Sequence, residues 1–384
     1  MTGRASEAAA FGGMVLFGIV VALLGAVLPL VSPPLGLDLG DVGNLFLTLN
    51  AAILAGSLVV GVVVDRFGYR AALTGGPLLI GAALVLVARA GAPLELAGAI
   101  ALLGLGGSAL NSATNALVAD LHPEPRVKAA ALNRLGAFFG LGALLLPLLM
   151  GILLHRLGLG PLLLAAAGLS VFTGTLSVLP RYPPAKQPEG LSLADARAVL
   201  RHPLVAILGA LLFFQAGTEM LLSGYLTTFL TSEAGASVRA ASLVLSGYWV
   251  ALITARVALG RVLLHVSALA LVPLMAGCAT VALALATVAP GVAAASVLLL
   301  VAAFALSGVT PTVLGVAGAA LPARTGTVFG LLFSLSVTGA MTLPWAAGHL
   351  AEAFGVRIVL VLGTSAFSVV TLLALRARHL GRAG

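Results

Sequence analysis

The chain has 384 residues, of which 60% are hydrophobic and 8% are charged, and its mean hydropathy is +1.17. A soluble globular protein carries about a quarter charged residues, so this composition excludes a water-soluble fold and indicates an integral membrane protein. The formal net charge is +8. Because the basic residues are scattered along the chain rather than gathered in a patch, we expect no nucleic-acid partner.

The spanning elements are expected to be helices, because the alternating apolar and polar pattern of a membrane barrel is absent. About 20 apolar residues of helix cross a hydrocarbon core of about 30 Å. The first run is expected to be a retained helix, since no small-residue cleavage site follows a short apolar core. In chain order, the twelve predicted spans are 9–31, 41–64, 70–89, 94–118, 129–154, 159–179, 203–230, 238–264, 267–288, 292–319, 325–348 and 355–375.

Between the sixth and seventh spans lies the only long polar stretch, which opens with a cluster of prolines. Its second part, "LSLADARAVLRH" (191–202), is predicted to be a short amphipathic helix with Ser192 as its N-cap. Six spans, a linker and six spans indicate a duplicated unit. We therefore predict an all-α membrane fold with two pseudo-symmetric six-helix bundles, at 1–179 and 203–384, joined by a cytoplasmic linker at 180–202.

Lys and Arg residues concentrate in both tails and in the loops that follow even-numbered spans, whereas the opposite loops hold few of them. Since cytoplasmic loops carry this excess, both termini and the central linker are expected to be cytoplasmic. The expected location is the inner membrane of a bacterium, with the chain as a multi-pass protein. On the predicted cytoplasmic side are Arg4, Arg66, Arg70, Arg126, Lys128, Arg181, Lys186, Arg197, Arg201, Arg261, Arg324, Arg376, Arg378 and Arg382.

The loop between the second and third spans reads "GVVVDRFGYR" and carries Gly61, Asp65, Arg66, Gly68 and Arg70. In this place and at this spacing it resembles the signature loop of the major facilitator superfamily. The resemblance implies an ion-pair and helix-dipole latch that favours the outward-facing state. In physical terms, the first glycine would permit close helix approach and the second a tight turn. The alternative is a basic loop that only fixes topology.

A second resemblance is to the fucose, glucose and galactose permease branch of that superfamily, and it implies monosaccharide uptake. One departure matters, because permeases of that branch place proton-carrying carboxylates in helices one and four. Here the first predicted span, 9–31, has no acidic residue, and Asn111 occupies the position in the fourth. The blocks that carry the resemblance are "GLGGSALNSATNALVADL" (104–121), "ALNRLGAFFGLGALLLPLL" (131–149), "FFQAGTEMLLSGYLTTFL" (213–230), "SGYWVALITARVALGR" (246–261) and "SGVTPTVLGVAGAALP" (307–322).

Polar side chains inside the spans are few, and such residues usually face a cavity or a partner helix. Two pairs are spaced i and i+4, one in each half, so both members of each pair face the same way. Amides both donate and accept hydrogen bonds, which suits a sugar, and an indole offers a stacking face. The alternative is interhelical hydrogen bonding that holds the bundle together. The predicted substrate-binding residues are Asn111, Asn115, Asn133, Gln215, Glu219 and Trp249.

Glu219 is the only one of the twelve acidic residues predicted to lie well inside a span. Three roles are open for it: carrying a coupling proton, binding the sugar directly, or acting as the structural partner of a polar neighbour. Arg256, in the eighth span, is interpreted as a side chain that snorkels toward the cytoplasm rather than one that pairs with an anion or a helix end.

These features predict a secondary transporter that moves a hexose-like monosaccharide by alternating access, with possible proton coupling through Glu219. The alternatives are a proton-coupled exporter of drugs or amphipathic metabolites and, from another class, a non-transporting receptor or scaffold. An enzyme is not expected, because the sequence has no Gly-rich phosphate loop with Lys and no serine elbow. No cofactor or metal site is expected, and the expected partners are the solute, a proton and the lipid bilayer around a monomer.

Overall fold

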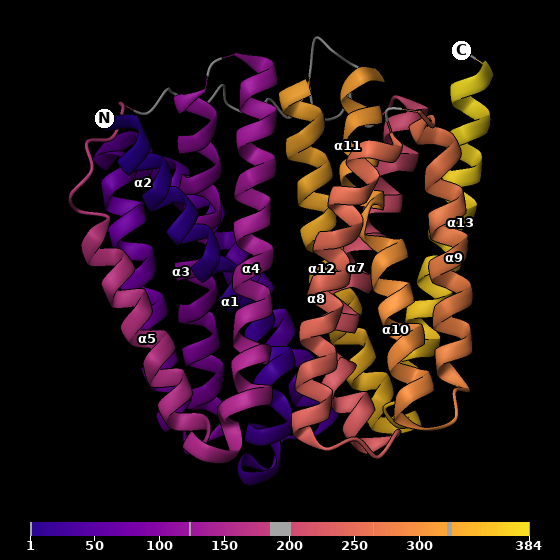
Figure 1. Cartoon of the computed structure of the whole chain (residues 1–384), viewed down its shortest axis with the longest axis horizontal. Helices are drawn as coiled ribbons and strands as arrows, with labels where there is room; N and C mark the ends of the chain where they lie inside the picture. Colours follow the sequence, from indigo (N-terminus) through magenta and orange to yellow (C-terminus); the bar gives the residue numbers. More distant parts are fainter. Residues whose placement is uncertain (1, 123, 185–200, 264, 321–324, 384) are drawn as a thin grey trace. The chain divides into compact units, whose positions relative to one another are not determined.

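The computed structural model describes residues 2–122, 124–184, 201–263, 265–320 and 325–383, and the regular secondary structure of these residues is helical (Figure 1). Twelve segments of the described residues are long and apolar enough to span a membrane, which confirms the all-α membrane fold. The helices are α1 (Thr2–Leu35), α2 (Leu39–Arg89), α3 (Pro93–Leu121), α4 (Pro125–Leu157), α5 (Leu159–Leu176), α7 (Pro203–Ser232), α8 (Val238–Val262), α9 (Ala268–Thr287), α10 (Gly291–Ser307), α11 (Val309–Ala320), α12 (Thr325–Phe354) and α13 (Ile358–Ala383).

The helix boundaries differ from the predicted spans in several places. α1 begins at Thr2, seven residues before the predicted start, because the polar segment "ASEAAA" is rich in good helix formers. The second and third spans form the single element α2, which kinks at Gly68. The tenth span is divided into α10 and α11 at Gly308. The amphipathic helix predicted from Ser192 falls largely on 185–200, outside the described residues.

The described helices group into two compact units. The first unit is formed mainly by α1 to α5, and the second mainly by α7 to α13. Leu39–Gly43, at the start of α2, groups with the second unit, and Val238–Ser246, at the start of α8, groups with the first. In the first unit α1 packs against α3, α4 and α5, and in the second α7 packs against α10, α11, α12 and α13.

Glycines bring one pair of helices into backbone contact in each unit. In the first unit, a β-carbon at Gly142 on α4 would collide with the carbonyl oxygen of Val15 on α1. In the second, a β-carbon at Gly339 on α12 would collide with the carbonyl oxygen of Phe213 on α7. At such small-residue crossings, van der Waals packing holds membrane helices together in place of the hydrophobic effect.

The two crossings are equivalent positions of the duplicated unit. Gly142 and Gly339 are 197 residues apart (339 − 142). Their counterparts on the facing helices, Gly18 on α1 and Gly217 on α7, are 199 residues apart (217 − 18). The same backbone contact therefore joins the first and fifth spans of each half, α1 with α4 and α7 with α12, and it is a structural feature that the two pseudo-symmetric halves share.

Replacing Gly142 by Ala is expected to destabilise the protein, because the new methyl group has no room against the α1 backbone. Gly136 lies on the same helix, and a β-carbon added there would meet nothing within 4 Å, so Gly136→Ala is the matched control. Overpacking costs about 1–3 kcal/mol, whereas Ala in an open helix position gains about 0.5–1 kcal/mol over Gly. Thermal unfolding in detergent should show a lower melting temperature for Gly142→Ala only; equal values would contradict the close crossing.

Candidate functional site

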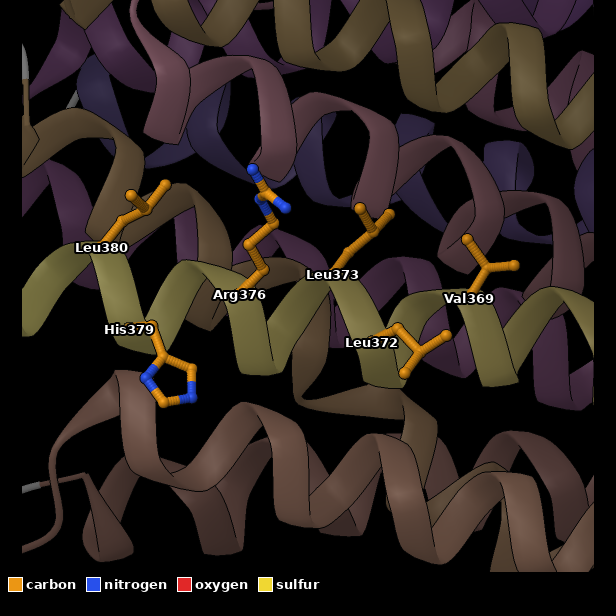
Figure 2. A pocket seen from close by; sticks show the side chains of 6 residues that line it. All are labelled: Val369, Leu372, Leu373, Arg376, His379 and Leu380. Atoms are coloured by element: carbon orange, nitrogen blue, oxygen red, sulfur yellow. The ribbon is translucent and has the colours of Figure 1, made fainter.

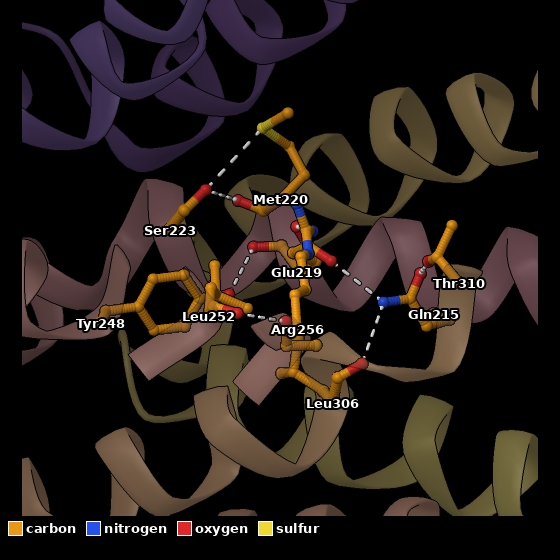
Figure 3. Close-up of polar contacts among 10 residues, drawn as sticks. Gln215, Glu219, Met220, Ser223, Tyr248, Leu252, Arg256, Leu306 and Thr310 are labelled. Carbon is orange, nitrogen blue, oxygen red and sulfur yellow. Dashed lines mark hydrogen bonds and ion pairs between the residues drawn. The ribbon is translucent and has the colours of Figure 1, made fainter. Parts of the chain in front are cut away.

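A charged pair lies within the apolar length of two helices in the second unit. Glu219, near the middle of α7, and Arg256, on α8, form an ion pair with 3.2 Å between Oε1 and Nη2 (Figure 3). The Glu219 side chain is 18% exposed and that of Arg256 is 34% exposed. The interpretation of Arg256 as a snorkelling side chain is wrong, because a carboxylate one helix away holds its guanidinium.

Gln215 precedes Glu219 by one helical turn and fixes its position. The Gln215 amide nitrogen donates to Oε2 of Glu219 at 3.0 Å and to the carbonyl of Leu306 at 3.4 Å. Its amide oxygen accepts a hydrogen bond from the Thr310 hydroxyl at 2.6 Å. The Gln215 side chain is fully buried, so its amide is committed to protein groups in this conformation. It acts here as a positioning residue.

The break between α10 and α11 supplies two of those partners, since Leu306 lies in the last turn of α10 and Thr310 in the first turn of α11 (Figure 3). The sequence explains the break: Pro311 has no N–H to donate to the carbonyl four residues earlier. At the junction a β-carbon on Gly308 would collide with the side chain of Leu259 on α8, so a larger residue there would force that side chain to move. The hydrogen bonds from Gln215 to both sides of this break were not predicted from the sequence.

Two aromatic residues of α8 complete the surroundings of Glu219. The Tyr248 hydroxyl donates to the main-chain carbonyl of Glu219 at 3.1 Å. The Trp249 ring packs edge-on against that of Tyr248, with centroids 5.8 Å apart, and Trp249 is 2% exposed. The stacking face predicted for Trp249 is therefore closed to a ligand in this conformation.

The polar pair of the first unit lies on α3. Asn115 donates to the side-chain oxygen of Asn111 at 3.2 Å and to its carbonyl at 2.8 Å. Both residues are half-buried and lie one turn apart on the same helix face, as their spacing predicts. The side chain of Asn133 lies outside what the structure describes. The structure thus brings together the members of each pair, and the meeting of the two pairs at one cavity stays a prediction.

The loop that resembles the superfamily signature lies at the kink of α2. Gly68 has φ 76° and ψ 172°, a left-handed conformation that requires glycine and produces the predicted tight turn. Arg70 donates to the carbonyl of Pro180 at 3.2 Å, and Arg66 lies over the ring of its neighbour Phe67. No close helix approach occurs at Gly61, where an added β-carbon would meet nothing within 4 Å. The side chain of Asp65 lies outside the described residues, and the latch role stays a prediction.

A second charged cluster in the first unit was not predicted from the sequence. Oε1 of Glu7 on α1 lies 3.3 Å from Nε2 of His122 and 3.1 Å from Nη2 of Arg134. Beside it, the Tyr69 hydroxyl donates to Asp120 at 2.7 Å. The sequence feature that could have indicated this cluster is Glu7, an acidic residue in a helix-forming segment that precedes the first predicted span.

One cavity in the second unit is lined by none of the residues of the two polar sites. It is an open groove of about 680 Å³ along α13, lined by Val369, Leu372, Leu373, Arg376, His379 and Leu380 (Figure 2). Its lining is apolar along most of its length, with two basic side chains toward the C-terminal end. Since α13 is a spanning helix, this groove has the character of a surface that faces lipid rather than of a solute site.

Comparison with known proteins identifies the family. The family model described as Major Facilitator Superfamily matches residues 10–344. The chain belongs to the Major Facilitator Superfamily. It is therefore a multi-pass membrane transporter that carries a small-molecule solute across a lipid bilayer by secondary transport.

Solved structures agree with this fold. The nucleoside transporter NupG, as its D323A mutant, superposes with a TM-score of 0.80 at 14% identity, covering 98% of this chain and 100% of that one. A bacterial homologue of the human lysosomal transporter Spinster superposes with a TM-score of 0.80 at 16% identity, covering 97% and 96% of the two chains. At these identities the likeness shows the fold alone. No protein of curated function matches the sequence, and the sugar-permease resemblance stays a prediction.

Removing either member of the Glu219–Arg256 pair is expected to destabilise the protein more than removing both. A single Glu219→Gln or Arg256→Gln change leaves one charge without its partner, and coupling energies of contacting residues are about 0.5–3 kcal/mol. Glu233 and Arg357, also 3.2 Å apart but more exposed, form the control pair, with an expected coupling of about 0–1 kcal/mol. Thermal unfolding of the wild type, single mutants and double mutant of each pair measures the two coupling energies. Equal coupling energies would contradict a special role for the Glu219–Arg256 pair.

Proposed function

We propose that this chain is a proton-coupled secondary transporter that moves a hexose-like solute across the inner membrane of a bacterium by alternating access. Glu219 is the proton-carrying group and Arg256 its partner in the ionised state. Asn111, Asn115 and Asn133 supply substrate contacts from the first half of the chain. Both termini lie in the cytoplasm, and the signature loop from Gly61 to Arg70 acts as the conformational latch.

The observation that carries the proposal is the ion pair at the middle of α7, 3.2 Å long and partly exposed. Ionisable residues within a membrane span are expensive, and in transporters they mark proton or solute pathways. The carboxylate of Glu219 pairs with Arg256 on α8 and accepts a hydrogen bond from Gln215, whose amide also bonds to both sides of the break between α10 and α11. A carboxyl placed in this way can transmit protonation to the packing of α7, α8, α10 and α11.

The resemblance to the sugar-permease branch supports the hexose-like solute, and the amide pair on α3 supports a polyhydroxylated ligand. The half-buried Asn111 and Asn115 leave an amide N–H and an amide oxygen without partners among the described residues. These free groups are available to hydroxyls of a solute. The groove on α13 does not support the exporter alternative, because its lining has the character of a lipid-facing surface.

Uptake into proteoliposomes tests the proposal. We expect saturable uptake of labelled hexoses or their close derivatives that an inside-alkaline pH gradient stimulates. Glu219→Gln should abolish the stimulation while exchange of solute across the membrane persists, because a neutral amide can neither take up nor release a proton.

The matched control is Glu233→Gln, which removes a carboxylate from the end of α7 and should leave gradient stimulation intact. Equal uptake with and without the gradient in the wild type would overturn the proton coupling. Absence of saturable uptake for every sugar and sugar derivative would overturn the solute class and promote the exporter.

A further inference from the structure

We propose that Arg256 is an anion-binding residue, and that the transported solute carries a carboxylate which replaces Glu219 at the guanidinium when Glu219 is protonated. The chemical class that fits is a hydroxylated carboxylate, such as a hexuronate. The inference rests on the proposed function and narrows its solute from a neutral hexose to an acid of similar size.

The ion pair leaves most of the Arg256 guanidinium without acceptors. A guanidinium has five N–H donors, and among the described residues Arg256 donates only through Nη2, to Oε1 of Glu219. Its Nε is buried without a partner. Stable arginine–carboxylate pairs are frequently bidentate, but here Gln215 occupies the second carboxylate oxygen. This one-point contact on a side chain that is 34% exposed suits an exchangeable carboxylate.

Charge balance couples that carboxylate to a proton. While both side chains are ionised, the pair has no net charge. Protonation of Glu219 leaves Arg256 as an uncompensated cation within a membrane-spanning segment, which is costly unless an anion replaces the lost charge. A proton and a carboxylate therefore favour each other's binding. When the solute leaves, the Glu219 O–H bond breaks, the proton departs and the original pair forms again.

Within the second unit, few other charges face Glu219. On α8, Tyr248 reaches only its main-chain carbonyl, and Arg256 is the partner already described. Arg261 lies five residues beyond Arg256, toward the helix end, and α10 and α11 carry no titratable residue. The exchange therefore depends on Glu219 and Arg256 themselves.

The helices on the other side of α7 carry their charges far from this level. α12 meets α7 at Gly339, and its first titratable residue, His349, follows ten residues later, about 15 Å along the helix. α13 meets α7 at Gly363, and its first basic residue, Arg376, follows thirteen residues later, about 20 Å along the helix. Neither helix offers a competing anion or cation for the pair.

Binding of D-glucuronate and D-glucose to the purified full-length protein tests the inference, because the two probes differ only at C6, which is a carboxylate in glucuronate and a hydroxymethyl group in glucose. We expect wild-type protein to bind glucuronate about tenfold more tightly at acidic than at alkaline pH. Glu219→Gln, which mimics the protonated residue, should bind it tightly at both pH values. Arg256→Gln should weaken glucuronate binding by about tenfold or more, and should weaken it more than it weakens glucose binding.

Glu233→Gln is the control for loss of a carboxylate and should keep the wild-type pH dependence. Equal affinity for the two probes in wild type, or no gain of glucuronate affinity in a folded Glu219→Gln protein, overturns the inference. Uptake of hexose and of glucuronate into proteoliposomes distinguishes failure of this inference from failure of the proposed function. Saturable hexose uptake without glucuronate uptake refutes only the inference, whereas absence of flux for both refutes the hexose-like solute as well.

Discussion

The ion pair between Glu219 and Arg256 is the interaction on which the second unit depends. Each charge alone would be costly among the apolar helices, and the pair reduces that cost by placing an acceptor beside a donor at 3.2 Å. Gln215 carries the effect further, because its amide joins Glu219 to both sides of the break between α10 and α11. Under the proposed proton coupling, a change in the proton of this carboxyl acts on α7, α8, α10 and α11 at once.

The close helix crossings at glycine form the rigid part of each unit. Gly142 and Gly339 bring backbones into contact in equivalent places of the two halves, so each unit contains a helix pair with little room to deform. Movable parts are then expected where the backbone is interrupted, at Gly68 and at Gly308. A transporter that changes access by moving bundles needs this combination of stiff crossings and defined breaks.

The sequence predicts the fold well because span length and hydropathy follow from the thickness of the bilayer. Its limits are local: the extension of α1 to Thr2 and the division of the tenth span at Gly308 depend on helix propensity and on contacts between helices. For the site, the i and i+4 spacing correctly pairs Gln215 with Glu219 and Asn111 with Asn115. The partnership with Arg256 was missed, because periodicity within one helix says nothing of which residue on another helix lies opposite.

The central claim is that a proton and a carboxylate exchange with the ion pair during transport, and the charge moved per cycle tests it most directly. Glucuronate uptake should be measured in proteoliposomes adsorbed to a solid-supported electrode, with internal pH followed in parallel. The account predicts that one proton enters with each glucuronate anion, so uptake proceeds with internal acidification and without net current. A steady inward current, or glucuronate uptake without proton entry, would contradict it.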